Sequence, residues 1–107
     1  MVNISDFDAS EYLDNEEDAI AYLNAAAELN DPALLQAAIG DVAKARGMGQ
    51  IAKKAGVGRE SLYKSLAKDG NPSFRTISKV VNALGGHLVF EHQQPLHDHT
   101  KTVANID

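Results

Sequence analysis

Apolar residues at helical spacing predict two amphipathic helices before position 47. The first covers residues 15–29, where Asn15 can cap the helix and three acidic residues follow it at the positive end of the helix dipole. The second begins at Asp31, with proline at its first position, and ends at Arg46. The residues that we expect to be buried are Ile20, Leu23 and Ala27 in the first helix, and Leu35, Ala38, Ile39 and Val42 in the second.

The segment 48–66 predicts two short helices joined by a tight turn. Ala52 is small enough to let two helices cross closely, and Gly56 accepts a positive φ without strain. Leu62 and Leu66 give the second helix one apolar stripe, and this helix is expected to end near residues 68–70. The spacing is typical of a helix-turn-helix (residues 48–68), which places its second helix in the major groove of DNA.

A fifth helix is predicted over residues 73–84, with Ser73 as its cap and the glycine pair at 85–86 as its end. Its core positions are Ile77, Val80, Val81 and Leu84. The fold class is therefore all-α: a five-helix domain over residues 1–92, with acidic N-terminal helices over 8–46.

Residues 87–92 are rich in strand formers and predict one short C-terminal β-strand. A lone strand has no partner inside an all-helical domain, so it must pair with another chain, pair with its own copy, or remain an unpaired edge. We expect a homodimer in which this strand and the end of the fifth helix form the interface. The polar residues 93–107 predict a disordered tail.

Charge is strongly segregated along the chain, although the net charge is only −5. Residues 1–42 carry ten acidic side chains and no Lys or Arg, whereas residues 43–79 carry nine basic and two acidic side chains. Charges farther apart than a Debye length of about 8–10 Å are largely screened, so a polyanion would respond to the basic block rather than to the net charge. A solvated basic surface without a ligand is the alternative interpretation.

The polar face of the second short helix carries the candidates for reading DNA. Arg59 and Lys64 suit guanine acceptors, and Glu60 can accept a hydrogen bond from a cytosine amine. Ser61 and Tyr63 suit flanking base or phosphate contacts, and the sequence-independent phosphate contacts are expected from residues such as Lys53 in the first short helix.

Other chemistry has little support in the sequence. His87 and His92 would lie on opposite faces of the strand, His97 and His99 lie in the tail, and no cysteine is present to complete a metal site. The glycines between positions 40 and 49 lack the Gly-Lys-Ser/Thr of a phosphate loop. We therefore expect no enzyme, no metal and no cofactor. Without a signal peptide or a long apolar run, the protein is expected to be cytoplasmic and not bound to a membrane.

The chain from position 8 to position 88, about three-quarters of its length, resembles the HigA-like addiction-module antidote proteins. These are antitoxins with a helix-turn-helix of the phage repressor and Cro class. The matching pieces, in chain order, are DASEYLD, AYLNAA, DPALLQAAIGDVAKARGM, GVGRESLYKSL, GNPSFRT and ALGGHL. The resemblance implies a repressor-like fold, a double-stranded operator, and a RelE/HigB-like toxin that cleaves mRNA on the ribosome. The antitoxin would neutralise this toxin and repress their common operon.

Two glycines depart from the family pattern. Gly49 stands where a Thr or Ser more often caps the third helix, and Gly58 stands where a Ser usually caps the recognition helix. Phosphate binding is therefore expected to depend more on Gln50, Lys53 and the N-terminus of the fifth helix. The complete set of candidate DNA-binding residues is Gln50, Lys53, Gly58, Arg59, Glu60, Ser61, Tyr63, Lys64, Asn71, Ser73 and Arg75.

The acid-rich first 42 residues are an electrostatic complement of a basic RNA-cleaving toxin and could speed its association. Alternatively, these acids are solvated helix caps and faces. Two further functions stay open: an autonomous prophage-type repressor without a toxin, and a protein-interaction adaptor whose helix-turn-helix no longer binds DNA. The basic block counts against the adaptor.

Overall fold

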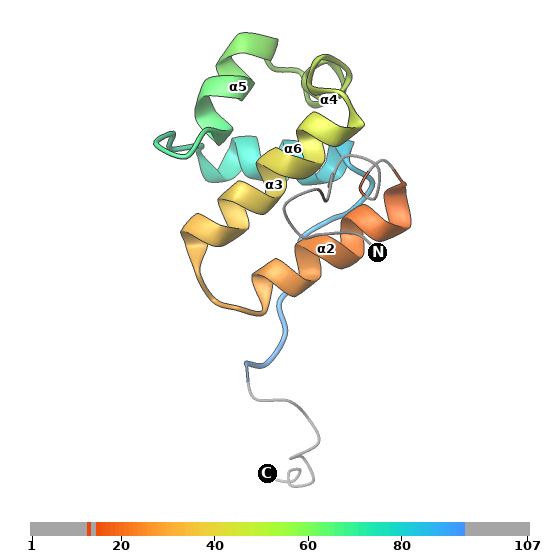
Figure 1. Cartoon of the computed structure of the whole chain (residues 1–107), viewed down its shortest axis with the longest axis vertical. Coiled ribbons are helices and arrows are strands. Elements are labelled where there is room, and N and C mark those ends of the chain that lie inside the picture. The colour runs from red at the N-terminus through yellow and green to blue at the C-terminus, as the bar shows by residue number, and fades with distance from the viewer. Residues whose placement is uncertain (1–12, 14, 94–107) are drawn as a thin grey trace, which may run out of the picture.

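The computed structural model describes residue 13 and residues 15–93. The predicted start of the acidic region at position 8, and residues 94–107 of the tail predicted over 93–107, lie outside these residues. The regular structure of the described part is helical: α2 (Glu16–Ala27), α3 (Pro32–Arg46), α4 (Met48–Ala55), α5 (Arg59–Leu66) and α6 (Phe74–Ala83) (Figure 1). None of these helices is long and apolar enough to cross a membrane.

Local side-chain caps explain where three helices begin. Asn15 Oδ1 accepts a hydrogen bond of 3.0 Å from the backbone N–H of residue 18, and Asp31 Oδ1 accepts from the N–H groups of residues 33 and 34 at 3.1 and 3.3 Å. Ser73 Oγ accepts from the N–H of Thr76 at 3.0 Å. Each cap pairs N–H groups that have no partner inside the helix. All three caps were predicted and are confirmed.

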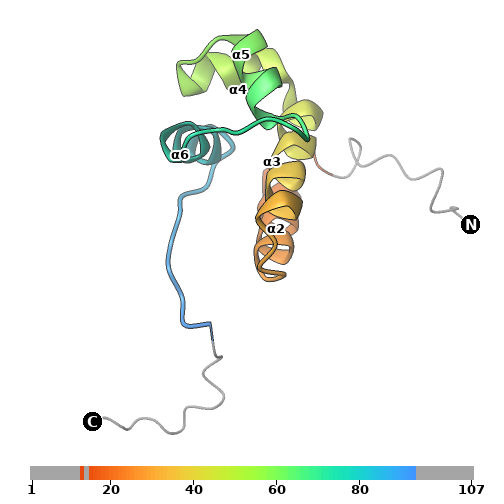
Figure 2. The same ribbon diagram turned by 90° about the vertical axis from the view of Figure 1, so that its left-hand side faces the viewer.

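Helix α3 lies at the centre of the domain. It contacts α2 on one side and α4 and α5 on the other, and α6 packs against α4 (Figures 1 and 2). The buried side chains form one hydrophobic core: Leu13, Ala19, Leu23, Ala26, Ala38, Ile39, Val42, Ala43, Met48, Ile51, Ala52, Ala55, Leu62, Leu66, Val80 and Leu84. Most predicted core positions of α3, α5 and α6 are confirmed as buried, whereas Leu35 and Ile77 are only partly buried and pack against the core.

The buried face of α2 differs from the prediction. Ala27 is exposed and Ile20 is only half-buried, whereas Ala19, Leu23 and Ala26 face the core. Ile20 lies instead against Gly86, where an added Cβ would come within 2.9 Å of Ile20 Cδ1. Alanines at 25, 26 and 27 give the helix no sequence signal for its rotation, so packing against α3 decides it.

One helix cap and two helix ends differ from the predictions. Helix α4 begins at Met48, as predicted, but its N-cap is Gly47 rather than position 49, and Met48 is 6% exposed. Gly49 therefore lies inside the first turn and caps nothing. Helix α5 ends at Leu66 rather than near 68–70, since Ala67 adopts an extended conformation. Helix α2 ends at Ala27, two residues before the predicted end.

The predicted strand over residues 87–92 is wrong for the single chain. These residues form no strand and run away from the helices (Figure 2). A strand needs a neighbour that completes its backbone hydrogen bonds, and the described part of the chain supplies none. Leu88, Val89 and Phe90 are consequently 44%, 64% and 96% exposed.

Candidate nucleic-acid interface

Helices α4 and α5 meet at a tight turn whose geometry depends on Gly56. Its φ of 73° lies in the left-handed region, which glycine adopts without strain. The turn is closed by hydrogen bonds from the N–H of Gly56 to Lys53 O at 3.2 Å and from the N–H of Val57 to Ala52 O at 3.0 Å. Ala52 is 2% exposed and lies in the core. The pair is thus compatible with the predicted helix-turn-helix.

Helix α5 has one buried and one exposed face, as predicted. Leu62 and Leu66 are 1% and 5% exposed. Gly58 precedes the helix and provides no side-chain cap, which agrees with the loss expected from a glycine at this position. The five polar candidates of the helix are exposed: Arg59, Glu60, Ser61, Tyr63 and Lys64.

Arg59 is exposed and lies beside two neighbours. Its guanidinium carbon lies 6.0 Å from the centroid of the Tyr63 ring, within the range of a cation–π contact. A Cβ added to Gly49 would lie 3.6 Å from Arg59 Cδ, so the arginine side chain also lies next to the first turn of α4. In the sequence Arg59 and Tyr63 are separate candidates, but the structure joins them into one unit beside the N-terminus of α4.

The remaining candidates lie on α4 and at the start of α6. Gln50, Lys53, Asn71 and Arg75 are exposed. Ser73 is exposed too, but its hydroxyl accepts the N–H of Thr76 and donates to Thr76 Oγ1 at 3.0 Å. Its side chain is occupied by capping, so a ligand at this point would meet mainly the free backbone N–H groups of the α6 N-terminus.

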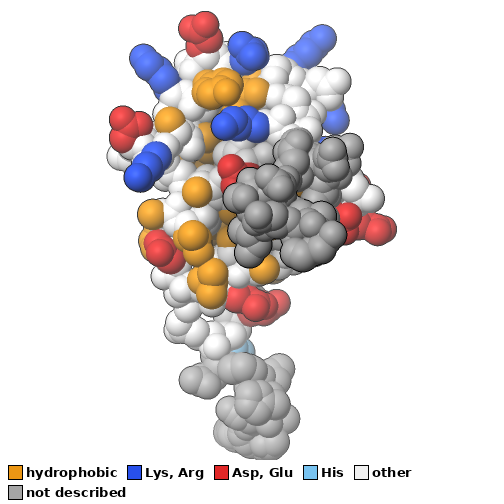
Figure 3. Space-filling view, in the orientation of Figure 1, with side chains coloured by type: hydrophobic (Ala, Val, Ile, Leu, Met, Phe, Trp, Pro, Cys, Tyr) orange, Lys and Arg blue, Asp and Glu red, His pale blue; other side chains and the backbone are white. Residues whose placement is uncertain are grey.

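Two basic residues that the sequence pattern did not single out also lie near this surface. Lys54 and Lys79 line a hollow of about 510 Å³ between α4 and α6, together with Arg75 and the 73% exposed Phe74. The helical period could have placed Arg75 and Lys79 on one face, but the proximity of Lys54 depends on how α4 packs on α6. Figure 3 shows Lys and Arg gathered toward the end of the molecule formed by α4 and α5.

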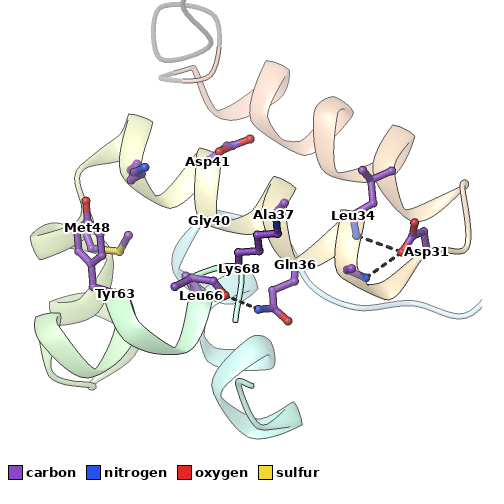
Figure 4. Close-up of a pocket in the computed structure, with 13 residues that line it drawn as sticks. Asp31, Leu34, Gln36, Ala37, Gly40, Asp41, Met48, Tyr63, Leu66 and Lys68 are labelled. Carbon is purple, nitrogen blue, oxygen red and sulfur yellow. Dashed lines mark hydrogen bonds between the residues drawn. The ribbon is translucent and has the colours of Figure 1, made fainter. Parts of the chain in front are cut away.

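A second hollow, of about 580 Å³, lies between α3 and α5 (Figure 4). Its wall includes the apolar Leu34 and Met48, the carboxylate of Asp41 and the ring of Tyr63. Asp41 also accepts a 3.2 Å hydrogen bond from the hydroxyl of Tyr22 on α2. Burial, and then the charge and hydrogen bond of Asp41, raise the pKa of Tyr22.

The described residues contain no group of three or more His, Asp or Glu side chains that could hold a metal ion. His97 and His99 lie outside the described part of the chain. The described residues form a small all-helical domain in which α4, the turn and α5 are compatible with a helix-turn-helix, and the exposed face of α5 is polar and lies in a basic region.

Comparison with known proteins identifies the family. A family model described as "Probable addiction module antidote protein" matches residues 3–92, and the chain belongs to this family. An uncharacterized protein of Haemophilus influenzae is 46% identical over 91 residues, which cover 85% of this chain and 92% of that protein. No solved structure matches. The predicted resemblance to antidote proteins is confirmed at this level, and membership of the family implies a toxin partner in general.

Proposed function

We propose that this antidote protein is a DNA-binding antitoxin of the HigA-like class. It neutralises a RelE/HigB-like mRNA-cleaving toxin and represses the operon that encodes both proteins in the cytoplasm. The observation that carries the DNA-binding part is the division of α5 into two faces. Leu62 and Leu66 are buried, whereas five polar side chains of the same helix are exposed within the basic block.

In this proposal α5 enters the major groove of the operator. Arg59 and Lys64 donate to guanine, and Glu60 accepts from cytosine, each good contact contributing about 1–3 kcal/mol of discrimination. Gln50, Lys53 and the N-terminus of α6 bind phosphates on either side of the groove. Tyr63 restricts the Arg59 side chain, which lowers the entropy that the arginine loses on binding.

The test uses a duplex selected from a random-sequence library by the wild-type protein, and a scrambled duplex of the same composition. Arg59→Ala and Lys64→Ala should relax the preference at particular positions by about 1–3 kcal/mol. Lys53→Ala is the matched control, because loss of a phosphate contact weakens binding to both duplexes and lowers the salt slope by about one. Unchanged specificity in both the Arg59 and Lys64 variants would contradict the assignment of α5 as the reader.

The active form is proposed to be a homodimer that uses residues 87–92 and the end of α6. Three adjacent apolar side chains, Leu88, Val89 and Phe90, project from the helical body, and contact with a second copy would remove them from water. The operator should then be palindromic, with half-sites about 10 base pairs apart or a small multiple of that distance. Sedimentation at micromolar concentration should give a dimer for the wild type and a monomer for Val89→Asp. A monomeric wild type would contradict this arrangement.

The toxin is proposed to dock on the acidic part of the domain. Residues 15–42 hold six acidic side chains and no Lys or Arg, which would attract a basic toxin and raise its association rate. Replacing both Glu16 and Glu17 with Gln should slow association with the toxin at low salt, whereas Glu91→Gln is the exposed control outside this region. Equal association rates for the wild type, the double variant and the control would show that Glu16 and Glu17 serve only the helix and its solvation.

A further inference from the structure

Gln36 on α3 connects to the far end of the proposed recognition helix. Its Nε2 donates to the carbonyl oxygen of Ala67 at 2.8 Å and to that of Gly70 at 3.1 Å. Figure 4 shows the side chain extending from α3 toward the end of α5. Ala67 is the C-cap residue of α5, and its carbonyl also accepts the N–H of Gly70 at 2.8 Å. One side chain thus holds two carbonyls of the turn that follows α5.

Close backbone packing reinforces this link. One turn beyond Gln36 on α3, a Cβ added to Gly40 would lie 3.3 Å from the carbonyl oxygen of Leu66. A Cβ added to Gly70 would overlap the carbonyl oxygens of Lys64 and Ser65. The end of α5 therefore lies between α3 and its own following turn; Gly70 leaves no room for a side chain, and a side chain at Gly40 would require its neighbour to shift by a few tenths of an ångström.

The same contacts stabilise the turn that stands where the sequence predicts further residues of α5. The local pattern favours a helix to about residues 68–70, but the structure stops it at Leu66. The carbonyl groups at a helix end need donors from outside the helix. Gln36 donates to the carbonyl of the C-cap residue Ala67 and to that of Gly70, which lies in the following turn, and so stabilises this turn.

We propose that Gln36 is a positioning residue for DNA binding. By holding the carbonyls of Ala67 and Gly70, it sets the distance between the reading face of α5 and two further proposed DNA contacts, the candidate Asn71 and the phosphate-binding N-terminus of α6. Each extra helical residue advances the chain by about 1.5 Å, so one added turn of α5 would move Asn71 by several ångströms. The reading face of α5 and the contacts at Asn71 and the α6 N-terminus could then no longer bind the same duplex at the same time. This inference rests on the proposed DNA binding.

The test is a double-mutant cycle on the duplex that the wild-type protein selects from a random library. Gln36→Met keeps the length of the side chain but removes both donors, and it should weaken binding about tenfold. In an Asn71→Ala background the further loss should shrink to less than about threefold, because the contact that Gln36 positions is already absent. In a Lys53→Ala background the loss should stay about tenfold, since Lys53 lies on α4.

Tyr22→Phe is the matched control. It also removes one side-chain hydrogen bond that involves α3, the 3.2 Å bond to Asp41, but this bond is directed toward α2. The control should bind the selected duplex within about twofold of the wild type. Amide hydrogen exchange at residues 67–71 should accelerate in Gln36→Met and not in Tyr22→Phe, which gives a readout independent of DNA.

Three results would overturn the inference. The first is operator affinity of Gln36→Met within about twofold of the wild type, and the second is an equal loss in the Asn71→Ala and Lys53→Ala backgrounds. The third is a Gln36→Met variant that no longer folds, because the residue would then serve the stability of the whole domain. A wild-type protein that selects no sequence would instead refute the proposed function itself, together with this inference.

Discussion

Leu62 attaches the proposed recognition helix to the core, and Leu62→Ala should destabilise the fold strongly. Leu62 is 1% exposed, and the neighbouring Leu66 on the same face is 5% exposed. Truncation removes three carbon groups, at about 0.8 kcal/mol for each buried methylene equivalent. Adding the cost of the cavity gives an expected loss of about 3 kcal/mol, within the range of about 2–5 kcal/mol that is typical of such changes.

The free energy of unfolding is measured by urea unfolding followed by circular dichroism. In thermal unfolding of a domain of this size, the same loss of about 3 kcal/mol corresponds to a fall in Tm of about 12–24 °C. Lys64→Ala, two residues later on the exposed face, is the control and should change stability by less than about 0.5 kcal/mol. Leu62→Met, which nearly conserves the side-chain volume, should cost less than about 1.5 kcal/mol.

Substitutions on the two faces of α5 should also differ in their effect on DNA binding. At a temperature where it is folded, Leu62→Ala should keep the wild-type preference for the selected duplex over the scrambled one, because it leaves the reading side chains intact. Lys64→Ala should keep its stability and lose part of that preference. A loss of less than about 1 kcal/mol in the free energy of unfolding for Leu62→Ala, or an equal loss for Lys64→Ala, would show that the buried face of α5 is wrongly assigned.

Three further changes probe a cap, a turn and a titrating group. Asp31→Ala removes the side-chain acceptor of the N–H groups at the start of α3 and should cost about 0.5–2 kcal/mol in urea unfolding, whereas Asp31→Ser should restore most of it. Gly56→Ala meets no neighbour within 4 Å but keeps a φ of 73°, so it should cost about 1–2 kcal/mol from backbone strain alone; no loss would mean that the turn does not adopt this conformation. Burial and Asp41 raise the pKa of Tyr22, so the folded state resists deprotonation of this hydroxyl, and the free energy of unfolding should fall as pH rises above about 10. Tyr22→Phe has no hydroxyl to titrate at this position, so any difference between its free energy of unfolding and that of the wild type should narrow above that pH.

Local sequence is enough to predict the helices and most of their starting points. The caps at Asn15, Asp31 and Ser73 form hydrogen bonds within three residues, so they depend on nearby chain only. The positive φ of Gly56 was predictable for the same reason, because the left-handed conformation is a property of one residue. The segregation of acidic and basic residues is also written directly in the sequence.

Contacts between distant segments, in contrast, arise only when the helices pack together. The rotation of α2 could not be read from consecutive alanines. The prediction of a strand after α6 was wrong because a strand needs a neighbouring strand to pair with, whatever its local propensity. The turn after α5 is held by Gln36, which reaches residues 31 and 34 positions further along the chain. Local periodicity carries no information about such bonds, because they exist only once α3 and α5 have packed together.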